Sequence, residues 1–127
     1  MSEQKPRAVC VGEVLIELAR GADGRFALSC GGDTFNTAIY LARAGVNAAF
    51  ATALGDDAYS DSIMALAAAE GVAANLILRV PGRLPGLCLV ENSRPGERSL
   101  RYWREGAPAH ELFEVADWMR VLSLIHI

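Results

Sequence analysis

The sequence has no excess of positive charge. Its 127 residues carry 12 Lys+Arg against 15 Asp+Glu, which gives a formal net charge of −3. A nucleic-acid-binding surface needs a basic patch to neutralise phosphates, so this balance argues against DNA or RNA as a partner. The chain also lacks the composition of a disordered protein, because 52% of its residues are hydrophobic and only 21% are charged. Its length suits a single globular domain.

Cysteine is scarce and unpatterned. Cys10, Cys30 and Cys88 lie far apart and form no C-x-x-C pair. An odd number of widely spaced cysteines supports neither a zinc ribbon nor a disulfide scaffold. We therefore expect three reduced thiols, as in a cytoplasmic protein.

A long uninterrupted apolar run is missing as well. Glu13 and Glu17 break the apolar stretch near the start of the chain, so no signal peptide is predicted. The most membrane-like window, residues 37–55, contains Arg43 and Asn47 and is typical of a helix, a turn and a strand. A spanning helix needs about 20 apolar residues, so no membrane contact is expected.

The order of apolar patterns predicts an α/β fold. Strands are predicted at residues 8–18, 46–54 and 75–80, with helices from Asp33 to Gly45 and at 58–70. Strands that alternate with helices in this way form a parallel sheet covered by helices. Asp33 or Thr34 is expected to cap the first helix, Gly45 to end it, and a carboxylate of the Gly55-Asp56-Asp57 turn to cap the second.

The pattern changes after Pro81, where prolines and glycines mark a loop. Residues 87–91 and 99–104 are predicted to be two strands joined by a turn. This hairpin need not join the parallel sheet, and pairing with residues 25–30 would give a small antiparallel sheet outside the main body. Residues 109–120 are predicted to be helical.

Residues 31–55, GGDTFNTAIYLARAGVNAAFATALG, resemble the first signature of the ribokinase-like (PfkB) sugar kinases. The matching positions are Gly31, Gly32, Asn36, Ala38, Gly45 and Gly55. Thr34 departs from the pattern, since many members have a small residue or proline there. Three later segments, TALGDDAYS, PGRLPGL and GERSLRYWRE, resemble the 2-keto-3-deoxygluconate kinase branch.

The resemblance implies a ribokinase-like architecture, with a partial parallel sheet flanked by helices and a small antiparallel β lid. Lid segments are expected at about 19–30 and 86–105, and residues 1–121 are expected to be the N-terminal part of the domain. Residues 122–127, LSLIHI, resemble a translated library adapter and are expected to be a non-native tail. Lids of this family can pair between subunits, so a homodimer through the lid is a further expectation.

Residues at the start of the first predicted helix could bind a ligand or serve the fold. Gly31 and Gly32 permit a tight turn with positive φ or a close ligand approach beside a helix N-terminus. Asp33 could cap the helix or accept sugar hydroxyls, and Asn36 could bond a neighbouring loop or a ligand. The resemblance favours sugar contact for all four residues.

The predicted strand at 99–104 would place Leu100, Tyr102 and Arg104 on one face. Arginine binds carboxylates through a paired, charge-assisted fork. By resemblance, Tyr102 and Arg104 are the positions that contact the sugar acid, whereas Arg98 and Arg101 are expected to be solvated. Cys88 departs from the branch, which often has an aromatic residue there.

The resemblance implies an ATP-dependent kinase that phosphorylates 2-keto-3-deoxygluconate with the help of Mg²⁺. The family's catalytic base and anion hole come from a Gly-Ala-Gly-Asp type motif, which these 127 residues lack. We therefore expect this chain to carry the sugar-binding side but neither catalytic base, nucleotide site nor metal site, and to be inactive alone. The alternatives are a kinase of fructose or ribose, and a non-catalytic sugar-binding or dimerising module.

Overall fold

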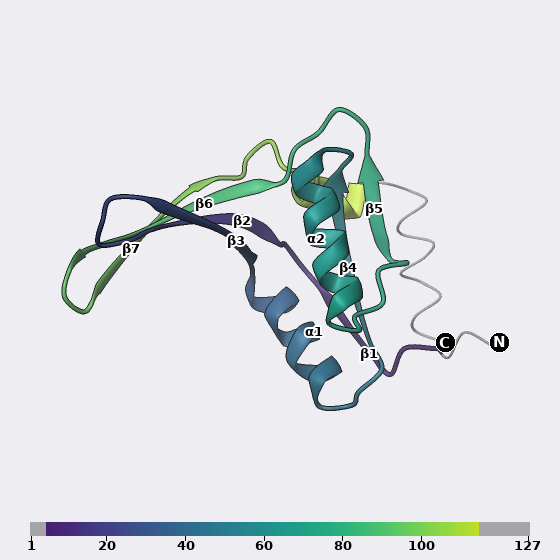
Figure 1. The fold of residues 1–127 in the computed structure, drawn as a ribbon. Coiled ribbons are helices and arrows are strands. Elements are labelled where there is room, and N and C mark those ends of the chain that lie inside the picture. Colours follow the sequence, from purple (N-terminus) through teal and green to yellow (C-terminus); the bar gives the residue numbers. More distant parts are fainter. Residues whose placement is uncertain (1–4, 115–127) are drawn as a thin grey trace.

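The computed structural model describes residues 5–114, which form two β-sheets, two α-helices and a short 3₁₀ helix (Figure 1). The elements along the chain are β1 (Ala8–Val11), β2 (Leu15–Arg20), β3 (Phe26–Gly31), α1 (Asp33–Arg43), β4 (Ala48–Gly55), α2 (Ala58–Ala69), β5 (Ile77–Val80), β6 (Gly86–Arg94), β7 (Glu97–Trp103) and η1 (Pro108–Glu114). The α/β prediction is confirmed.

The body of the molecule is a parallel sheet in the order β1-β4-β5. β4 is buried along its whole length because both of its faces are covered. Phe50 and Leu54 point into a core shared with both α-helices, where the tilted rings of Phe35 of α1 and Phe50 pack with their centroids 5.1 Å apart. The alternate residues of β4 face a second cluster that includes Leu112 of η1.

The other four strands form a second sheet, in the order β3-β2-β6-β7, which extends away from the body (Figure 1). We call these four strands the lid. β2 lies between β3 and the β6–β7 hairpin, so the hairpin does not pair directly with residues 25–30. The sheet is mixed rather than purely antiparallel, because β2 and β6 run parallel.

One predicted strand, residues 8–18, is two strands in different sheets, and the single-strand prediction is wrong. β1 pairs with β4 in the body, whereas β2 pairs with β3 and β6 in the lid. The apolar pattern continues through the junction because both halves are partly buried, so periodicity alone does not reveal the break at residues 12–14.

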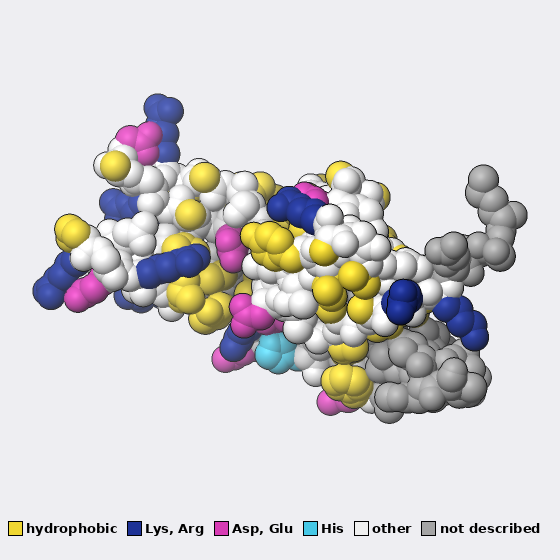
Figure 2. All heavy atoms as spheres, turned by 90° about the horizontal axis from the view of Figure 1, so that it is seen from below, with side chains coloured by type: hydrophobic (Ala, Val, Ile, Leu, Met, Phe, Trp, Pro, Cys, Tyr) yellow, Lys and Arg dark blue, Asp and Glu magenta, His cyan; other side chains and the backbone are white. Residues whose placement is uncertain are grey.

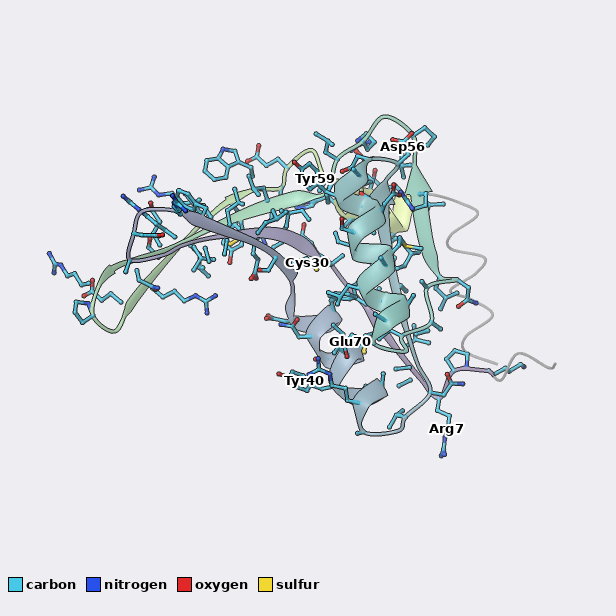
Figure 3. All side chains as sticks on the ribbon, in the orientation of Figure 1. Arg7, Cys30, Tyr40, Asp56, Tyr59 and Glu70 are labelled. Carbon is cyan, nitrogen blue, oxygen red and sulfur yellow. The ribbon has the colours of Figure 1, made fainter. Side chains whose placement is uncertain are left out.

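The lid leaves hydrophobic side chains in solvent. Figure 2 shows hydrophobic side chains at the lid end of the molecule as well as on the body. Phe26, Leu28 and Trp103 are exposed, at 46%, 58% and 58% respectively. The strand register places all three on the lid face opposite Leu15 and Cys88. Where the lid meets the body, Cys30 lies beside the start of α1 (Figure 3).

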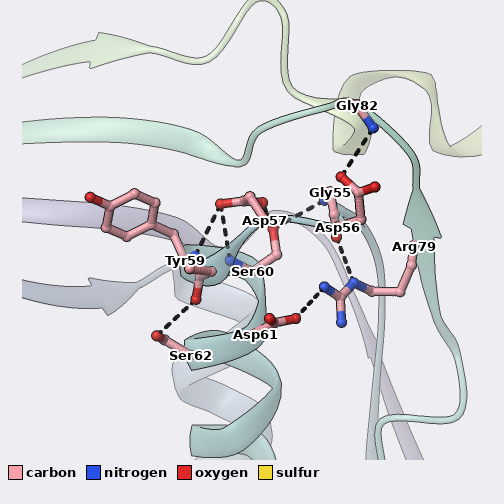
Figure 4. A network of polar contacts seen from close by, with 10 residues as sticks. Gly55, Asp56, Asp57, Tyr59, Ser60, Asp61, Ser62, Arg79 and Gly82 are labelled. Atoms are coloured by element: carbon pink, nitrogen blue, oxygen red, sulfur yellow. Dashed lines mark hydrogen bonds and ion pairs between the residues drawn. The ribbon is translucent and has the colours of Figure 1, made fainter.

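The two helices begin differently. Asp57 caps α2 as predicted: its carboxylate accepts hydrogen bonds from the backbone N–H groups of Tyr59 and Ser60, at 3.1 and 3.3 Å (Figure 4). The predicted cap of α1 by Asp33 or Thr34 is wrong, because the N-cap residue is Gly32 and no side chain caps this helix. Gly45 follows the end of α1, as predicted.

Beyond β7, the chain forms η1 where a helix at 109–120 was predicted. Only residues up to 114 of that prediction are described, and there the helix is of the tighter 3₁₀ type. The predicted tail at 122–127 lies outside the described residues. No helix of the described part is long and apolar enough to cross a membrane.

Candidate functional site

A hollow of about 420 Å³ lies where the lid meets the start of α1. Its walls come from the β1–β2 turn, the inner face of the lid and the first turn of α1. The lining residues are Gly12, Glu13, Leu15, Glu17, Gly32, Asp33, Thr34, Asn36, Cys88, Arg98, Leu100, Tyr102 and Arg104. Four separate parts of the sequence therefore meet around one polar space.

Gly32 lies close against the β1–β2 turn in this wall. A Cβ atom at this position would overlap the backbone carbonyl oxygen of Glu13, so only glycine fits without moving the β1–β2 turn. The backbone of Gly32 is extended (φ 162°), and neither it nor Gly31 uses the positive φ that the sequence allowed. Gly32 is needed here for close approach to the Glu13 backbone rather than for an unusual backbone angle.

The first turn of α1 brings polar groups to the hollow. Asp33 and Asn36 are both exposed and line it, three residues apart on the helix. Since no side chain caps α1, the backbone N–H groups of its first turn also lack a capping acceptor. A carboxylate, an amide and free N–H groups together can bind several hydroxyl groups of one small molecule.

The end of β7 supplies an aromatic ring and a cation. The guanidinium carbon of Arg104 lies 4.5 Å from the centroid of the Tyr102 ring. Arg104 Nη1 also donates to Glu13 Oε1 at 3.3 Å. Gly86 makes room for this side chain, because a Cβ at Gly86 would approach Arg104 Cβ to 2.9 Å.

Cys88 and Glu17 lie on the floor contributed by the lid, where the register places them side by side. Cys88 is buried, and burial together with the nearby Glu17 carboxylate raises the pKa of its thiol. A thiol with a raised pKa stays protonated at neutral pH and is a poor nucleophile. Cys88 therefore fills space in this wall rather than supplying reactive sulfur.

Five of the six residues predicted to contact a sugar line this hollow: Gly32, Asp33, Asn36, Tyr102 and Arg104. The sixth, Gly31, is buried as the last residue of β3, opposite Leu15, and does not line it. The alternation predicted for residues 100–104 thus brings Tyr102 and Arg104 to the same wall.

Sequence reasoning missed several lining residues. Arg98 was expected to be solvated; it is exposed but also lines the hollow, as the alternation with Leu100 and Tyr102 could have indicated. Arg101, expected to be solvated, lies opposite Leu89 and is exposed. Glu13 carried no usable signal, because its place in the hollow depends on the split between β1 and β2.

Metal binding finds no support in this part of the protein. Within residues 5–114, no three His, Cys, Asp or Glu side chains come together in a way that could hold a metal ion.

A parallel α/β body that carries a separate β lid above a polar hollow defines the class of carbohydrate kinases with a ribokinase-like fold. The chain belongs to the pfkB family of carbohydrate kinases, whose family model matches residues 5–126.

Known proteins within this family resemble the chain closely. It is 41% identical over 112 residues to the 2-dehydro-3-deoxygluconokinase of Dickeya dadantii. This match covers 84% of this chain and 36% of the relative. The crystal structure of 2-dehydro-3-deoxygluconokinase from Thermotoga maritima has a TM-score of 0.74 at 26% identity, over 82% of this chain and 34% of the other.

A fructokinase from Xylella fastidiosa, solved with bound ATP, has a TM-score of 0.70 at 31% identity, over 79% of this chain and 31% of that structure. The chain thus spans about a third of the length of the relatives that it matches.

Proposed function

We propose that this chain is the sugar-binding part of an ATP-dependent kinase that phosphorylates 2-keto-3-deoxygluconate, also named 2-dehydro-3-deoxygluconate, at its terminal hydroxyl. The observation that carries the proposal is the convergence of Gly32, Asp33, Asn36, Tyr102 and Arg104 on one hollow. The kinases named for this sugar acid among the relatives support the choice of substrate.

Each group in the hollow suits one part of such a substrate. The Asp33 carboxylate and the Asn36 amide offer acceptors and donors for sugar hydroxyls. The Arg104 guanidinium is a partner for the substrate carboxylate, and the Tyr102 ring provides a flat surface for the carbon skeleton. Gly32 adds no side-chain atoms to its part of the wall.

The chemical step itself needs groups that lie elsewhere. Phosphoryl transfer requires a base for the attacking hydroxyl and donors for the charge on the transferred group. We propose that the base, the ATP site and the Mg²⁺ site belong to parts of the protein beyond these 127 residues, and that the whole enzyme works in the cytoplasm, where ATP is available. The ATP-bound fructokinase supports ATP as the donor.

The test is Arg104→Leu in the protein made from the complete reading frame. We expect the KM for the sugar acid to rise at least tenfold while the KM for a neutral sugar such as fructose changes little, because only the acid loses a charge-assisted contact. Arg101→Leu is the matched control, since Arg101 lies on the opposite face of β7. Equal effects of Arg104→Leu on both sugars would refute the carboxylate contact.

A neutral sugar is the alternative substrate within the same family, and the similarity to a fructokinase supports it. A substrate panel separates the two proposals: a higher kcat/KM for fructose or ribose than for 2-keto-3-deoxygluconate would favour the alternative. The 127-residue chain alone is expected to phosphorylate none of these sugars.

The second candidate function is a sugar-binding module that dimerises through its lid. The exposed side chains of Phe26, Leu28 and Trp103 support it, because they lie on one face of the lid that a second copy of this chain could cover. Sedimentation of the wild-type chain and of Leu28→Lys tests it. A wild-type dimer that becomes monomeric on substitution is expected; a wild-type monomer at high concentration would contradict this candidate.

A further inference from the structure

Glu13 occupies the crossing from the body to the lid, between β1 and β2. One of its carboxylate oxygens, Oε1, accepts a hydrogen bond from Arg104 Nη1 at 3.3 Å, and the other, Oε2, lies 3.5 Å from His110 Nε2. Two residues from the segment that follows β7 thus meet the carboxylate of a residue about 90 positions earlier in the chain. None of the sequence motifs assigns a role to Glu13.

The backbone of Glu13 is fixed at both sides. Its carbonyl oxygen lies directly against Gly32, and the next residue, Val14, is 2% exposed within the body core. The carboxylate therefore projects from a point that cannot move without disturbing the core and the start of α1. A group held in this way can fix the position of a flexible partner.

Arg104 is such a partner. A long arginine side chain loses rotamer entropy when a ligand immobilises it. Here the Tyr102 ring lies 4.5 Å from the guanidinium carbon, and Glu13 contacts a single nitrogen, Nη1. The structure shows no acceptor for Arg104 Nε or Nη2 among residues 5–114. Glu13 thus holds one edge of the Arg104 guanidinium, and the other edge is left for a ligand.

We propose that Glu13 is the positioning residue for Arg104: it holds the guanidinium in the orientation that receives the carboxylate of an acidic sugar. This inference rests on the proposed function, which assigns the carboxylate contact to Arg104. Glu13 accepts from one guanidinium nitrogen at 3.3 Å, which is long for a charge-assisted hydrogen bond. It therefore orients the guanidinium and leaves the other nitrogens able to bind a ligand.

His110 completes the arrangement. Glu13 Oε2 is buried and has no hydrogen-bond partner among the described residues, and His110 Nε2 lies 3.5 Å from it. A buried carboxylate oxygen without a partner is costly, so His110 favours the rotamer in which Oε2 faces η1 and Oε1 faces Arg104. His110 therefore acts on Arg104 only through Glu13.

The experiment compares Glu13→Ala and Glu13→Gln in the protein from the complete reading frame, with the sugar acid and a neutral sugar as substrates. Glu13→Ala is expected to raise the KM for the acid about three- to tenfold, because the ligand must then order Arg104 itself. Glu13→Gln keeps an acceptor oxygen for Arg104 and is expected to stay within about twofold of wild type. The readout is the ratio of the KM for the acid to the KM for the neutral sugar, which Glu13→Ala is expected to raise and Glu13→Gln to leave near the wild-type ratio.

Glu91→Gln is the matched control, since Glu91 pairs with Arg20 at 3.7 Å in the lid and does not line the hollow. A lower KM for the acid in either Glu13 variant would overturn the inference, because Glu13 would then compete with the ligand for Arg104. An unchanged KM in Glu13→Ala, beside an acid-selective effect of Arg104→Leu, would overturn the inference alone. Equal effects of Arg104→Leu on the acid and on the neutral sugar would instead overturn the proposed function.

Discussion

Arg43 and Glu70 join the ends of the two helices. Arg43 Nε and Nη2 donate to the two oxygens of the Glu70 carboxylate at 2.7 and 2.6 Å, so the last turn of α1 is tied to the C-cap residue of α2. This paired hydrogen bond keeps the pKa of Glu70 below its usual range. It also offsets the unfavourable position of a carboxylate at a helix C-terminus.

We predict that Arg43→Ala lowers the thermal unfolding midpoint in low salt, and that the difference shrinks at about 1 M salt because exposed charges are then screened. The contribution of Glu70 is fully present above the ordinary glutamate pKa of about 4.3 and is lost as the pH falls through the lower folded-state pKa. Arg25→Ala is the control, since Arg25 lies 4.0 Å from Asp23 and is 90% exposed. Equal effects of the two substitutions would contradict this prediction.

Asp57→Ala should destabilise the protein by about 1 kcal/mol, because α2 loses the acceptor for two backbone N–H groups. Although burial acts in the opposite direction, hydrogen bonds from Ser60 and the backbone lower the pKa of Asp57. Its stabilisation is therefore present above about pH 4 and lost in more acidic solution.

Urea unfolding at several pH values measures this effect. The control is Asp33→Ala, which removes an aspartate from the start of the other helix, where no side-chain cap exists. If Asp33→Ala proved as destabilising as Asp57→Ala, the cap that Asp57 provides would not account for the lost stability.

Phe35→Ala should cost about 3–5 kcal/mol, which approaches the whole stability of a small domain. Phe35 is fully buried, and its ring packs against Phe50 in the core beneath both helices. Phe113→Ala removes the same atoms from a side chain that is 63% exposed and should change little. Circular dichroism during urea titration compares the two, and similar midpoints would contradict the position of the core.

Gly32→Ala should abolish sugar binding or weaken it at least tenfold, because the added methyl group must displace the Glu13 carbonyl and thereby one wall of the hollow. Gly106→Ala is a matched control, since a Cβ there meets no atom within 4 Å. Calorimetric titration with 2-keto-3-deoxygluconate in the full-length protein measures both. Wild-type affinity in Gly32→Ala would show that the hollow is not where the sugar binds.

Cys88 is expected to resist alkylation in the folded protein, because burial raises the pKa of its thiol and shields the sulfur. Mass spectrometry after brief exposure to iodoacetamide should find Cys88 unmodified in native conditions and modified in urea. A Cys88→Ser variant identifies the peptide. Rapid native labelling of Cys88 would mean that the lid opens to solvent at this strand.

The helices and the parallel strands could be predicted from the sequence because their signals are local. The apolar stripe that includes Phe35 and Ile39 defines α1, and Asp57 lies at the correct spacing to cap α2. The alternation of Tyr102 and Arg104 on β7 is equally local, since successive side chains of a strand point to opposite faces. These features follow from spacing along the chain alone.

What only the tertiary structure decided is how distant segments meet. Residues 8–18 read as one strand, yet the chain crosses from one sheet to another at Glu13, because each half finds different partners. That crossing brings the Glu13 carboxylate to Arg104, 91 positions later, and sets its carbonyl against Gly32. Apolar periodicity indicates that a residue is buried, but it does not indicate which residues it packs against. The hollow and its Glu13–Arg104 pair therefore form only when the two sheets are assembled.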